Sequence, residues 1–278
     1  MIYDLKKKIY KKEKANILLC FLYNTIIGRI ILKLINNKII SNMYAKFMTS
    51  KLSKFKIKKF IKKNNINMNE YIKQDYKSFN DFFIRKIKPS KRKIEDGIIA
   101  VCDSKILAYE INDNSKFKIK NSIYTIEELI QEKNTKYKWI IIFRLSVDDY
   151  HHYIFPDNGK VNSSKYIKGK LHTVQPIAHK KYKVFIENSR CITYLDCDKM
   201  GKVCYIEVGA LMVGKIVNEN IKTFKKADEK GHFEFGGSTI ILLFEKDIKI
   251  KNIILENSKK NIETIIKLGE NIGDINEK

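Results

Sequence analysis

Ser238 follows two glycines and precedes an apolar run, in the stretch Phe235-Gly236-Gly237-Ser238-Thr239 and then 240–244. Because neither glycine carries a Cβ atom, a nucleophile can approach the Gly237 carbonyl closely, and unusual backbone angles cost little there. The run after Ser238 begins with β-branched residues and predicts a buried strand that holds the serine at its entrance. A serine fixed in that place could attack its own chain. The same tetrapeptide is also typical of a tight turn that enters a strand.

Histidines and one acid supply the groups that could activate such a serine. Two of the five histidines, His151 and His152, follow the strand-like run 139–145. An imidazole at a strand end is well placed to act as a general base, although a surface pair on a loop fits the pattern equally well. Asp103 lies between apolar runs, where a carboxylate needs a partner. It could be a turn residue or could orient a histidine, so serine, histidine and aspartate are together compatible with an activated nucleophile.

The elements that must position these residues change in character along the chain. From about residue 98, strand-like runs alternate with turn signals such as Asp157-Asn158-Gly159, and Thr125 and Glu128 have the spacing of a capping box ahead of a short helix. Segment 15–35 is the most apolar stretch, but Arg29 in its middle argues against a transmembrane span. It predicts one or two helices lying in a membrane interface, with a buried helix of a soluble domain as the alternative. The expected strands are 97–109, 139–145, 184–186, 191–195, 203–207 and 239–244.

Positive charge is concentrated in the first hundred residues, which carry 25 Lys/Arg against 7 Asp/Glu in a chain of net charge +24. Only five of the 55 basic residues are arginines, which argues against nucleic acid as a partner and favours an anionic lipid surface. A compositional bias toward lysine with no target is the alternative. The five cysteines form no Cys-x-x-Cys pair, so we expect a reduced intracellular protein without a metal site or disulfides. We also expect no secretory signal.

Several segments resemble phosphatidylserine decarboxylase, the pyruvoyl-dependent lipid enzyme, in the order in which that family has them. The resemblance covers roughly residues 20–245. The matching segments are Leu22-Tyr23-Asn24-Thr25 with Gly28-Arg29, Ser78-Phe79-Asn80-Asp81-Phe82-Phe83-Ile84-Arg85-Lys86, Asp103-Ser104-Lys105, Asp149-Tyr150-His151, Glu207-Val208-Gly209-Ala210 with Val213-Gly214, Lys230-Gly231-His232-Phe233 and Phe235-Gly236-Gly237-Ser238-Thr239.

The resemblance implies a self-processing proenzyme. Ser238 would attack the Gly237 carbonyl and become a pyruvoyl group, leaving chains 1–237 and 238–278 as a heterodimer that is compatible with a higher oligomer. Asp103 and His151 would assist the serine. The second histidine of the family's Asp-Tyr-His-x-x-His pattern is Ile154 here, so His152 and His172 are further candidates. The pyruvoyl carbonyl would take up the substrate amine and accept the electrons released as CO₂ leaves, converting phosphatidylserine to phosphatidylethanolamine.

These observations together predict an α+β protein with two regions. Residues 1–95 would form a basic, amphipathic helical region that associates with membranes, and residues 96–278 a β-rich catalytic core. The expected location is the cytoplasmic face of the cell membrane, as a peripheral protein. Two other functions stay open. One is a non-catalytic anionic-lipid-binding homologue that has lost self-processing, and the other is a pyruvoyl decarboxylase that acts on a soluble amino acid.

Overall fold

A large mixed sheet forms the centre of the molecule. The computed structural model describes residues 1–13, 17–36, 38–111, 116–119, 122–133, 136–211, 215–235 and 238–276. The order of the described strands in this sheet is β13 (Thr223–Phe224), β9 (Gly159–Ile167), β10 (Arg190–Cys197), β11 (Gly201–Gly209), β15 (Ser238–Phe244), β7 (Trp139–Leu145), β4 (Ser104–Glu110), β17 (Glu263–Ile266), β1 (Ile2–Asp4) and β2 (Ile9–Lys11).

Strand β15 lies in the interior of this sheet, hydrogen-bonded on both edges. It pairs antiparallel with β11 on one side and with β7 on the other. All its residues are buried, which explains why its sequence is continuously apolar after the first two positions rather than alternating. The predicted strand 239–244 is therefore confirmed, and it begins at Ser238.

Alternate residues of β15 face two different cores, since successive side chains of a strand point to opposite faces. Ile240 and Leu242 lie in one buried cluster, and Ile241 and Leu243 lie in another. The first cluster includes residues of two small sheets. One consists of β12 (Ile216–Asn218), β14 (Glu229–Phe233) and β8 (His152–Ile154). The other consists of β16 (Ile248–Ile250), β18 (Asn271–Ile275) and β3 (Ile98–Ile99). The second includes residues of α6 (Ile126–Ile130) and α7 (Val184–Glu187). A hairpin of β5 (Lys116–Ile119) and β6 (Ser122–Thr125) precedes α6, and α8 (Asn252–Lys259) packs on β4 and β17.

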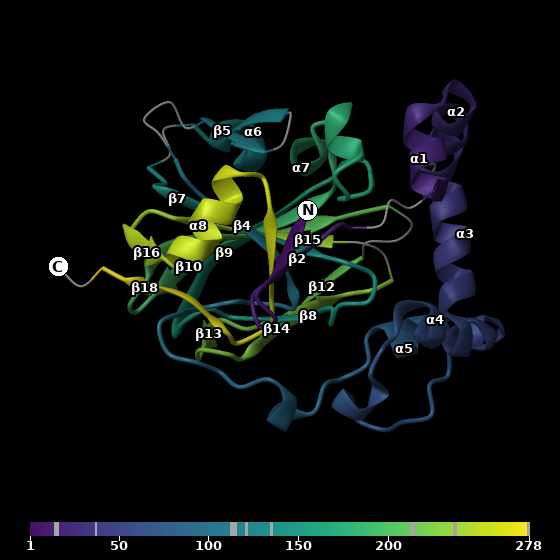
Figure 1. Cartoon of the computed structure of the whole chain (residues 1–278), viewed down its shortest axis with the longest axis horizontal. Helices are drawn as coiled ribbons and strands as arrows, with labels where there is room; N and C mark the ends of the chain where they lie inside the picture. The colour runs from purple at the N-terminus through teal and green to yellow at the C-terminus, as the bar shows by residue number, and fades with distance from the viewer. Residues whose placement is uncertain are drawn as a thin grey trace.

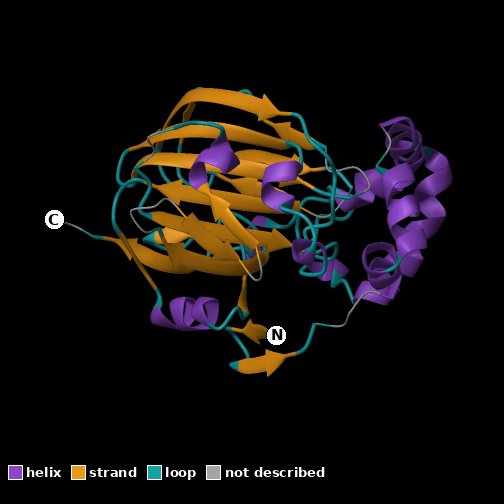
Figure 2. Cartoon of the chain, turned by 90° about the horizontal axis from the view of Figure 1, so that it is seen from above, coloured by secondary structure: helices purple, strands orange, loops and turns teal. Residues whose placement is uncertain are grey.

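The N-terminal helices stand to one side of the sheets, as both views show (Figures 1 and 2). Thr25 caps the second helix by accepting a hydrogen bond from the Gly28 amide at 2.9 Å. Gly28 also lies against the first helix, where a Cβ atom would come within 2.1 Å of the Phe21 carbonyl oxygen, so only glycine allows this approach. The helices of this region are α1 (Ile17–Asn24), α2 (Ile26–Ile35), α3 (Lys38–Thr49), α4 (Lys56–Asn64) and α5 (Phe79–Phe83), with 3₁₀ turns at Lys51–Phe55, Met68–Glu70 and Pro89–Lys91, and another in the core at Ala178–Lys180.

Among the described helices, none is by itself long and apolar enough to cross a membrane. Helices α1 and α2 reach that length and composition only when taken together, and they are bent by 101° relative to each other.

The structure confirms the predicted α+β class and corrects some elements. The capping box forms, with the Glu128 amide donating to the Thr125 hydroxyl at 3.1 Å. The predicted strand 184–186 is wrong, because this segment is the helical turn α7, whose Val184 and Phe185 are buried in the second core. Packing on that core overrides the strand preference of a short apolar run. The run 97–109 is divided into β3 and β4 rather than continuous.

The boundary of the helical region also differs from the prediction of 1–95. Residues 2–4 form β1, which pairs in parallel with β17 near the C-terminus, and β2 pairs with β1. The first strands thus extend the large sheet, and among the described residues the helices begin at Ile17.

Candidate active site

Ser238 is held between Leu145 of β7 and Gly209 of β11. Its side chain is fully buried, and its hydroxyl has no hydrogen-bond partner among the described residues. A buried hydroxyl without a partner forgoes the hydrogen bonds that water would give it, at a cost of about 1–3 kcal/mol. Gly236 and Gly237, on which the predicted cleavage depends, lie outside the described residues. Of the predicted cleavage site, the structure therefore describes only Ser238, whose hydroxyl is held in place without a hydrogen-bond partner among the described residues.

The face of the sheet decides which groups Ser238 can meet. Because Ser238 is two residues before Ile240, it faces the same side as Ile240 and Leu242. That cluster contains Tyr153 of β8 and Phe233 of β14, so the small sheet β12–β14–β8 lies on this side. The serine therefore points toward the space between the large sheet and this small sheet.

His151 immediately precedes β8 and is fully buried. Its carbonyl accepts a hydrogen bond from the Phe233 amide at 3.0 Å. Its Nδ1 lies 2.8 Å from the carbonyl oxygen of Asp149, which only accepts, so Nδ1 carries the ring proton. Burial lowers the pKa of His151 to about 3, so the ring is neutral and Nε2 keeps a lone pair. Because that Nε2 has no partner among the described residues, it is available to act as a base.

Helix α5 supports both the histidine and the approach to the serine. The ring of Phe83 packs on the His151 ring at 4.2 Å and on the Phe235 ring at 5.2 Å. The Phe235 amide also donates to the Asn80 side-chain oxygen at 3.0 Å. Phe235 is three residues before Ser238. This short helix thus fixes the imidazole and the strand entrance relative to each other.

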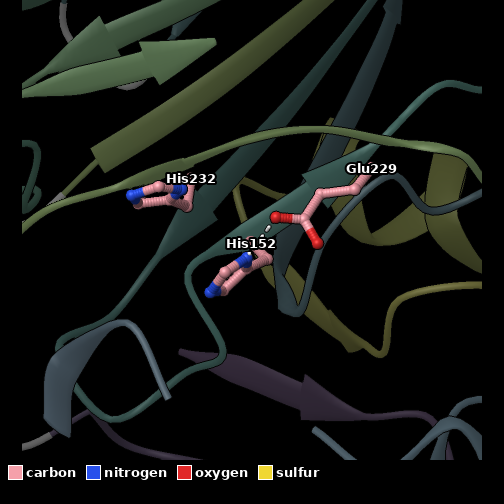
Figure 3. Close-up of side chains that lie close together, drawn as sticks. All are labelled: His152, Glu229 and His232. Carbon is pink, nitrogen blue, oxygen red and sulfur yellow. Dashed lines mark hydrogen bonds and ion pairs between the residues drawn. The ribbon is translucent and has the colours of Figure 1, made fainter. Parts of the chain in front are cut away.

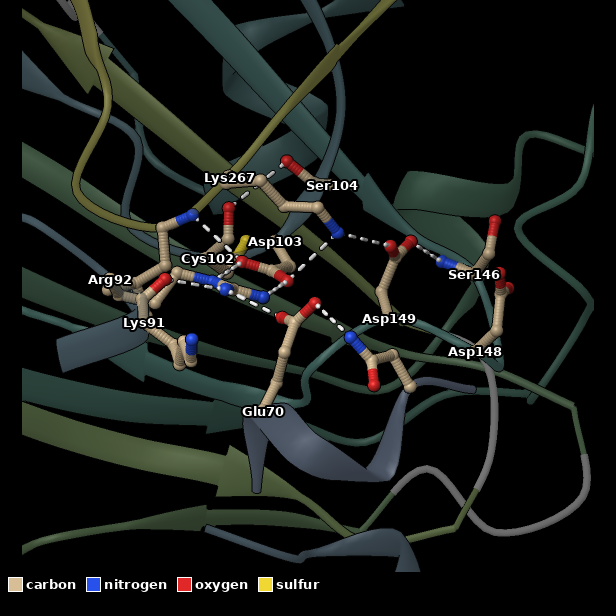
Figure 4. Close-up of polar contacts among 12 residues, drawn as sticks. Glu70, Lys91, Arg92, Cys102, Asp103, Ser104, Ser146, Asp148, Asp149 and Lys267 are labelled. Carbon is tan, nitrogen blue, oxygen red and sulfur yellow. Dashed lines mark hydrogen bonds and ion pairs between the residues drawn. The ribbon is translucent and has the colours of Figure 1, made fainter. Parts of the chain in front are cut away.

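Asp103 lies at the N-terminal end of β4 in a cationic cluster (Figure 4). The Arg92 guanidinium binds its two oxygens at 2.8 and 2.5 Å, Lys267 donates at 3.0 Å and the Leu268 amide donates at 2.9 Å. In the described chain its oxygens contact no imidazole. Contrary to the prediction, Asp103 therefore does not orient a histidine directly, because its carboxylate is bound by Arg92 and Lys267.

Asp149 connects this cluster to His151. Burial raises the pKa of its carboxyl, but the Lys105 and Lys267 ammonium groups, each 3.7 Å away, outweigh that effect and the net shift is downward. Its side chain also accepts from the Ser146 amide at 2.8 Å. Asp149 therefore stays ionised while its carbonyl holds the His151 ring. Lys267 joins Asp103 to Asp149, so Asp103 reaches the histidine only indirectly.

A buried ion pair also occupies the Ser238 face of the sheet. Glu207 of β11 is fully buried and binds Lys230 of β14, whose ammonium also lies 4.8 Å from the Tyr205 ring centre. Burial raises the pKa of Glu207, and Lys230 opposes this. The second carboxylate oxygen of Glu207 has no partner within the described part of the chain. In the ladder Glu207 is opposite Ile240, one diagonal step from Ser238.

Comparisons with known proteins identify the family. A model described as phosphatidylserine decarboxylase matches residues 79–274. The chain is 51% identical over 283 residues to phosphatidylserine decarboxylase proenzyme 2 of Clostridium acetobutylicum, covering 99% of this chain and 97% of that protein. The chain belongs to the phosphatidylserine decarboxylase family. It is also 38% identical to a phosphatidylserine decarboxylase proenzyme of Clostridium novyi, covering 98% of both, and 40% identical to one of Fusobacterium nucleatum, covering 77% and 76%.

Phosphatidylserine decarboxylase proenzymes use a pyruvoyl group derived from serine by self-cleavage, which confirms the predicted cofactor. The surroundings of Ser238 fit such a group. Its hydroxyl is buried, unsatisfied within the described residues and held at a strand entrance. The assignment of Ser238 as the precursor stays a prediction.

The other two candidate histidines point away from Ser238. His172 stacks on Tyr182 at 4.1 Å and packs edge-on against Tyr23 at 6.3 Å. Both tyrosines belong to the core on the opposite face of the large sheet. His152 follows His151 in the chain, so its ring points to the other side of β8, and both its nitrogens have partners. Of the three candidate histidines, only His151 therefore has a ring that strand alternation turns toward the Ser238 side of the large sheet.

The sequence interpretation missed the Glu207–Lys230 pair and the supporting role of Phe83. An acid inside a strand as apolar as 203–208 was a signal for the first, since a charge there requires a buried partner. Phe83 gave no comparable signal, because an aromatic residue in a short helix predicts only packing.

Proposed function

We propose that this chain is a phosphatidylserine decarboxylase that matures by cutting itself before Ser238 and acts at an anionic membrane surface. One observation carries the site assignment. Two buried groups, the Ser238 hydroxyl and the Nε2 of His151, both lack partners among the described residues. By strand alternation they face the same side of the large sheet as Ile240 and Tyr153. Unsatisfied nucleophile and base are the two parts that intramolecular attack requires.

The self-cleavage would proceed from the residues of the chain itself. Ser238 Oγ attacks the carbonyl carbon of residue 237 while His151 Nε2 takes the hydroxyl proton. The peptide C–N bond breaks, the nitrogen of Ser238 takes that proton, and an ester joins the two chains. Loss of the Ser238 Cα proton and breakage of its Cβ–O bond then release the carboxylate of chain 1–237. Uptake of water and loss of ammonia leave the pyruvoyl group on chain 238–278.

When bound at this position, the pyruvoyl group supplies an electron sink for loss of CO₂ from phosphatidylserine. The protein's own contribution is geometry and proton transfer. The apolar residues around Ser238 exclude water from the reacting centre. His151, held through Nδ1 by the Asp149 carbonyl, has its Nε2 free to carry a proton to the substrate carbon.

Helices α1 and α2 would hold the enzyme on the membrane. Their outward side chains include Ile17, Ile26 and Ile27, which are 85%, 70% and 65% exposed. Isoleucines so exposed lose no protein contacts when they enter lipid, and the surrounding lysines attract anionic headgroups. We therefore propose a peripheral location on the cytoplasmic face of the cell membrane, where the lipid surface is anionic.

The cleavage is tested by comparing wild type with Ser238→Ala and His151→Gln. Intact-mass measurement should give chains 1–237 and 238–278 for wild type, with a keto group that reacts with hydrazine, and one uncut chain for Ser238→Ala. His151→Gln should cut much more slowly at an unchanged melting temperature. An uncut wild-type chain without a keto group would support the non-catalytic lipid-binding homologue instead.

The substrate and the membrane contact need separate assays. Wild type should release CO₂ from phosphatidylserine vesicles and not from free serine, whereas turnover of free serine would favour a decarboxylase of soluble amino acids. Ile27→Glu should weaken sedimentation with anionic vesicles. Ile72→Glu is the matched control, because Ile72 is 44% exposed but lies outside α1 and α2. Equal vesicle binding by Ile27→Glu and wild type would contradict the proposed contact.

A further inference from the structure

Strands β8 and β14 bring three metal-ligand side chains together on one side of the small sheet. His152 lies directly opposite His232, and Glu229 lies opposite Ile154. Glu229 and His232 are three residues apart, so a regular strand would turn them to opposite faces. The pairing register shifts between Glu229 and Gly231, and such a bulge returns Glu229 to the face that His232 occupies. Figure 3 shows the three side chains converging.

The ligand atoms are close enough for one ion. One nitrogen from each histidine and one Glu229 oxygen all lie within 4.8 Å of one another. His152 Nδ1 is 2.8 Å from Glu229 Oε1, and the two imidazole rings are 5.0 Å apart between centres. Because ligand bonds to zinc are about 2.0–2.2 Å, small side-chain rotations that bring His232 closer and separate His152 from Glu229 would let all three bind one ion.

The hydrogen bond of His152 to a backbone carbonyl is typical of metal-binding histidines, which donate their second ring N–H to such a group. His152 Nε2 lies 2.8 Å from the Ile84 carbonyl oxygen just after α5, so it must donate there and leave Nδ1 as the ligand atom. Tyr150 stacks on the same ring at 4.9 Å and fixes its plane. His232 Nδ1 is buried and has no hydrogen-bond partner within the described residues. A fixed histidine, an acid and an unsatisfied imidazole are thus in place.

We propose that His152, Glu229 and His232 form a binding site for a divalent transition-metal ion of the zinc type. Two imidazoles and one carboxylate are a ligand set that zinc accepts, and a fourth position would hold water. The site is distinct from the reactive centre, since His152 points to the opposite side of β8 from His151. The ion would displace the proton between His152 and Glu229, and Lys86, 3.2 Å from the other Glu229 oxygen, would compete with it.

The position of the site gives the ion a structural role. It would bridge β8 and β14 and, through the His152–Ile84 bond, connect both strands to the end of α5. These are the elements that carry His151, Phe83 and the approach to Ser238. An ion that binds the folded protein and not the unfolded chain raises the melting temperature.

The test uses the full-length protein, free of any histidine tag and stripped of metal with a chelator. Cobalt(II) added at about pH 8, where protons compete little with the metal, should give a saturable visible spectrum at one ion per chain, which zinc then abolishes. Zinc should also raise the melting temperature of wild type, and Mg²⁺, which prefers oxygen ligands, should not.

Variants separate this site from adventitious binding. His232→Ala removes a half-buried ring and should weaken cobalt binding by at least about tenfold, as should Glu229→Gln. Glu234→Gln is the matched control, because it removes an acid on the same segment that pairs with Lys215 instead, and it should bind like wild type. Absence of a saturable spectrum in wild type, or equal affinity in His232→Ala, would overturn the proposal.

Discussion

Burial without a hydrogen-bond partner is shared by Ser238 Oγ, His151 Nε2 and one oxygen of Glu207, as far as the described residues extend. Each such atom lowers stability, because the folded chain does not replace its bonds to water. The three gather on one side of the large sheet, around the bond that is expected to break. Local costs of this kind are expected where residues must stay available for chemistry.

Lys230 tests the energetics of this site, since it is the cation that compensates buried Glu207. Lys230→Met should destabilise the metal-free protein by about 3–5 kcal/mol in urea unfolding, because a lone carboxylate stays buried. Lys215→Met, which breaks the exposed pair with Glu234, should cost less than about 1 kcal/mol. Adding Glu207→Gln to Lys230→Met should recover much of the loss. Equal losses from the two lysine variants would contradict this account.

His172 should make stability depend on pH. Burial lowers its pKa, and the groups that face it are Glu187, Lys170, Tyr23 and Tyr182. The unfolded chain therefore binds a proton below about pH 6.5 that the folded protein does not, so stability falls as pH falls through that range. His172→Gln should reduce the loss of unfolding free energy between about pH 7 and about pH 5.5. An identical pH dependence in variant and wild type would refute this.

Among the secondary-structure elements, α5 is a short helix with a wide influence on the site. Its core consists of aromatic residues that also pack against α3 and α4. Through Phe83 and Asn80 it touches His151 and the residue that leads to Ser238. Any movement of α5 would change the distance between the proposed base, His151, and the proposed nucleophile, Ser238, and an error of about 1 Å can slow a reaction about 10²-fold.

Phe83→Leu should therefore slow self-cleavage more than its effect on stability explains. We expect a roughly tenfold or larger decrease in the rate of chain separation, followed by intact mass after synthesis. Phe60→Leu is the matched control, because Phe60 packs on Phe79 and Phe82 in the same cluster and shows no ring contact with His151 or Phe235 within the described residues. Equal slowing by the two variants at equal stability would show that α5 acts only through folding.

Local sequence patterns predicted the elements of the core. The contacts between residues far apart in the sequence could not be predicted in this way. The apolar run after Ser238 and the capping box at Thr125 appear where the sequence places them, because burial and capping are local properties. The pairing of β1 with β17 joins residues more than 250 positions apart and has no sequence signal. The cationic partners of Asp103 were missed for the same reason, since Arg92 and Lys267 meet it only through the fold.

For the molecule as a whole, the most basic part of the chain is also the part whose helices stand apart from the sheets. The first hundred residues carry most of the net charge of +24, and the described helices of this region stand beside the sheets (Figure 1). In the proposed membrane attachment, their exposed apolar side chains would add a second attraction to lipid, and contact with acyl chains does not depend on salt. Changing the ionic strength should therefore separate the electrostatic contribution to membrane binding from the apolar one.

Raising the salt concentration should weaken binding to anionic vesicles while leaving self-cleavage unchanged. The Debye length shortens from about 10 Å at 0.1 M to about 3 Å at 1 M salt, which screens the lysines but not the buried site. Vesicle sedimentation and intact mass, measured in the same samples, check the two parts. Binding that is indifferent to salt would assign the attachment to the apolar side chains of α1 and α2 instead.

The interior position of β15 would decide whether the two chains separate after the proposed scission before Ser238. The segment from Ser238 onward supplies β15, α8 and β17, so a chain cut before Ser238 would stay held in the sheet by the hydrogen bonds of these strands to β11, β7 and β4. The two products cannot drift apart without dismantling that sheet. After complete denaturation, however, the severed pieces must find each other by diffusion, whereas the precursor refolds as one chain. Recovery from urea should therefore depend on protein concentration only in the processed form.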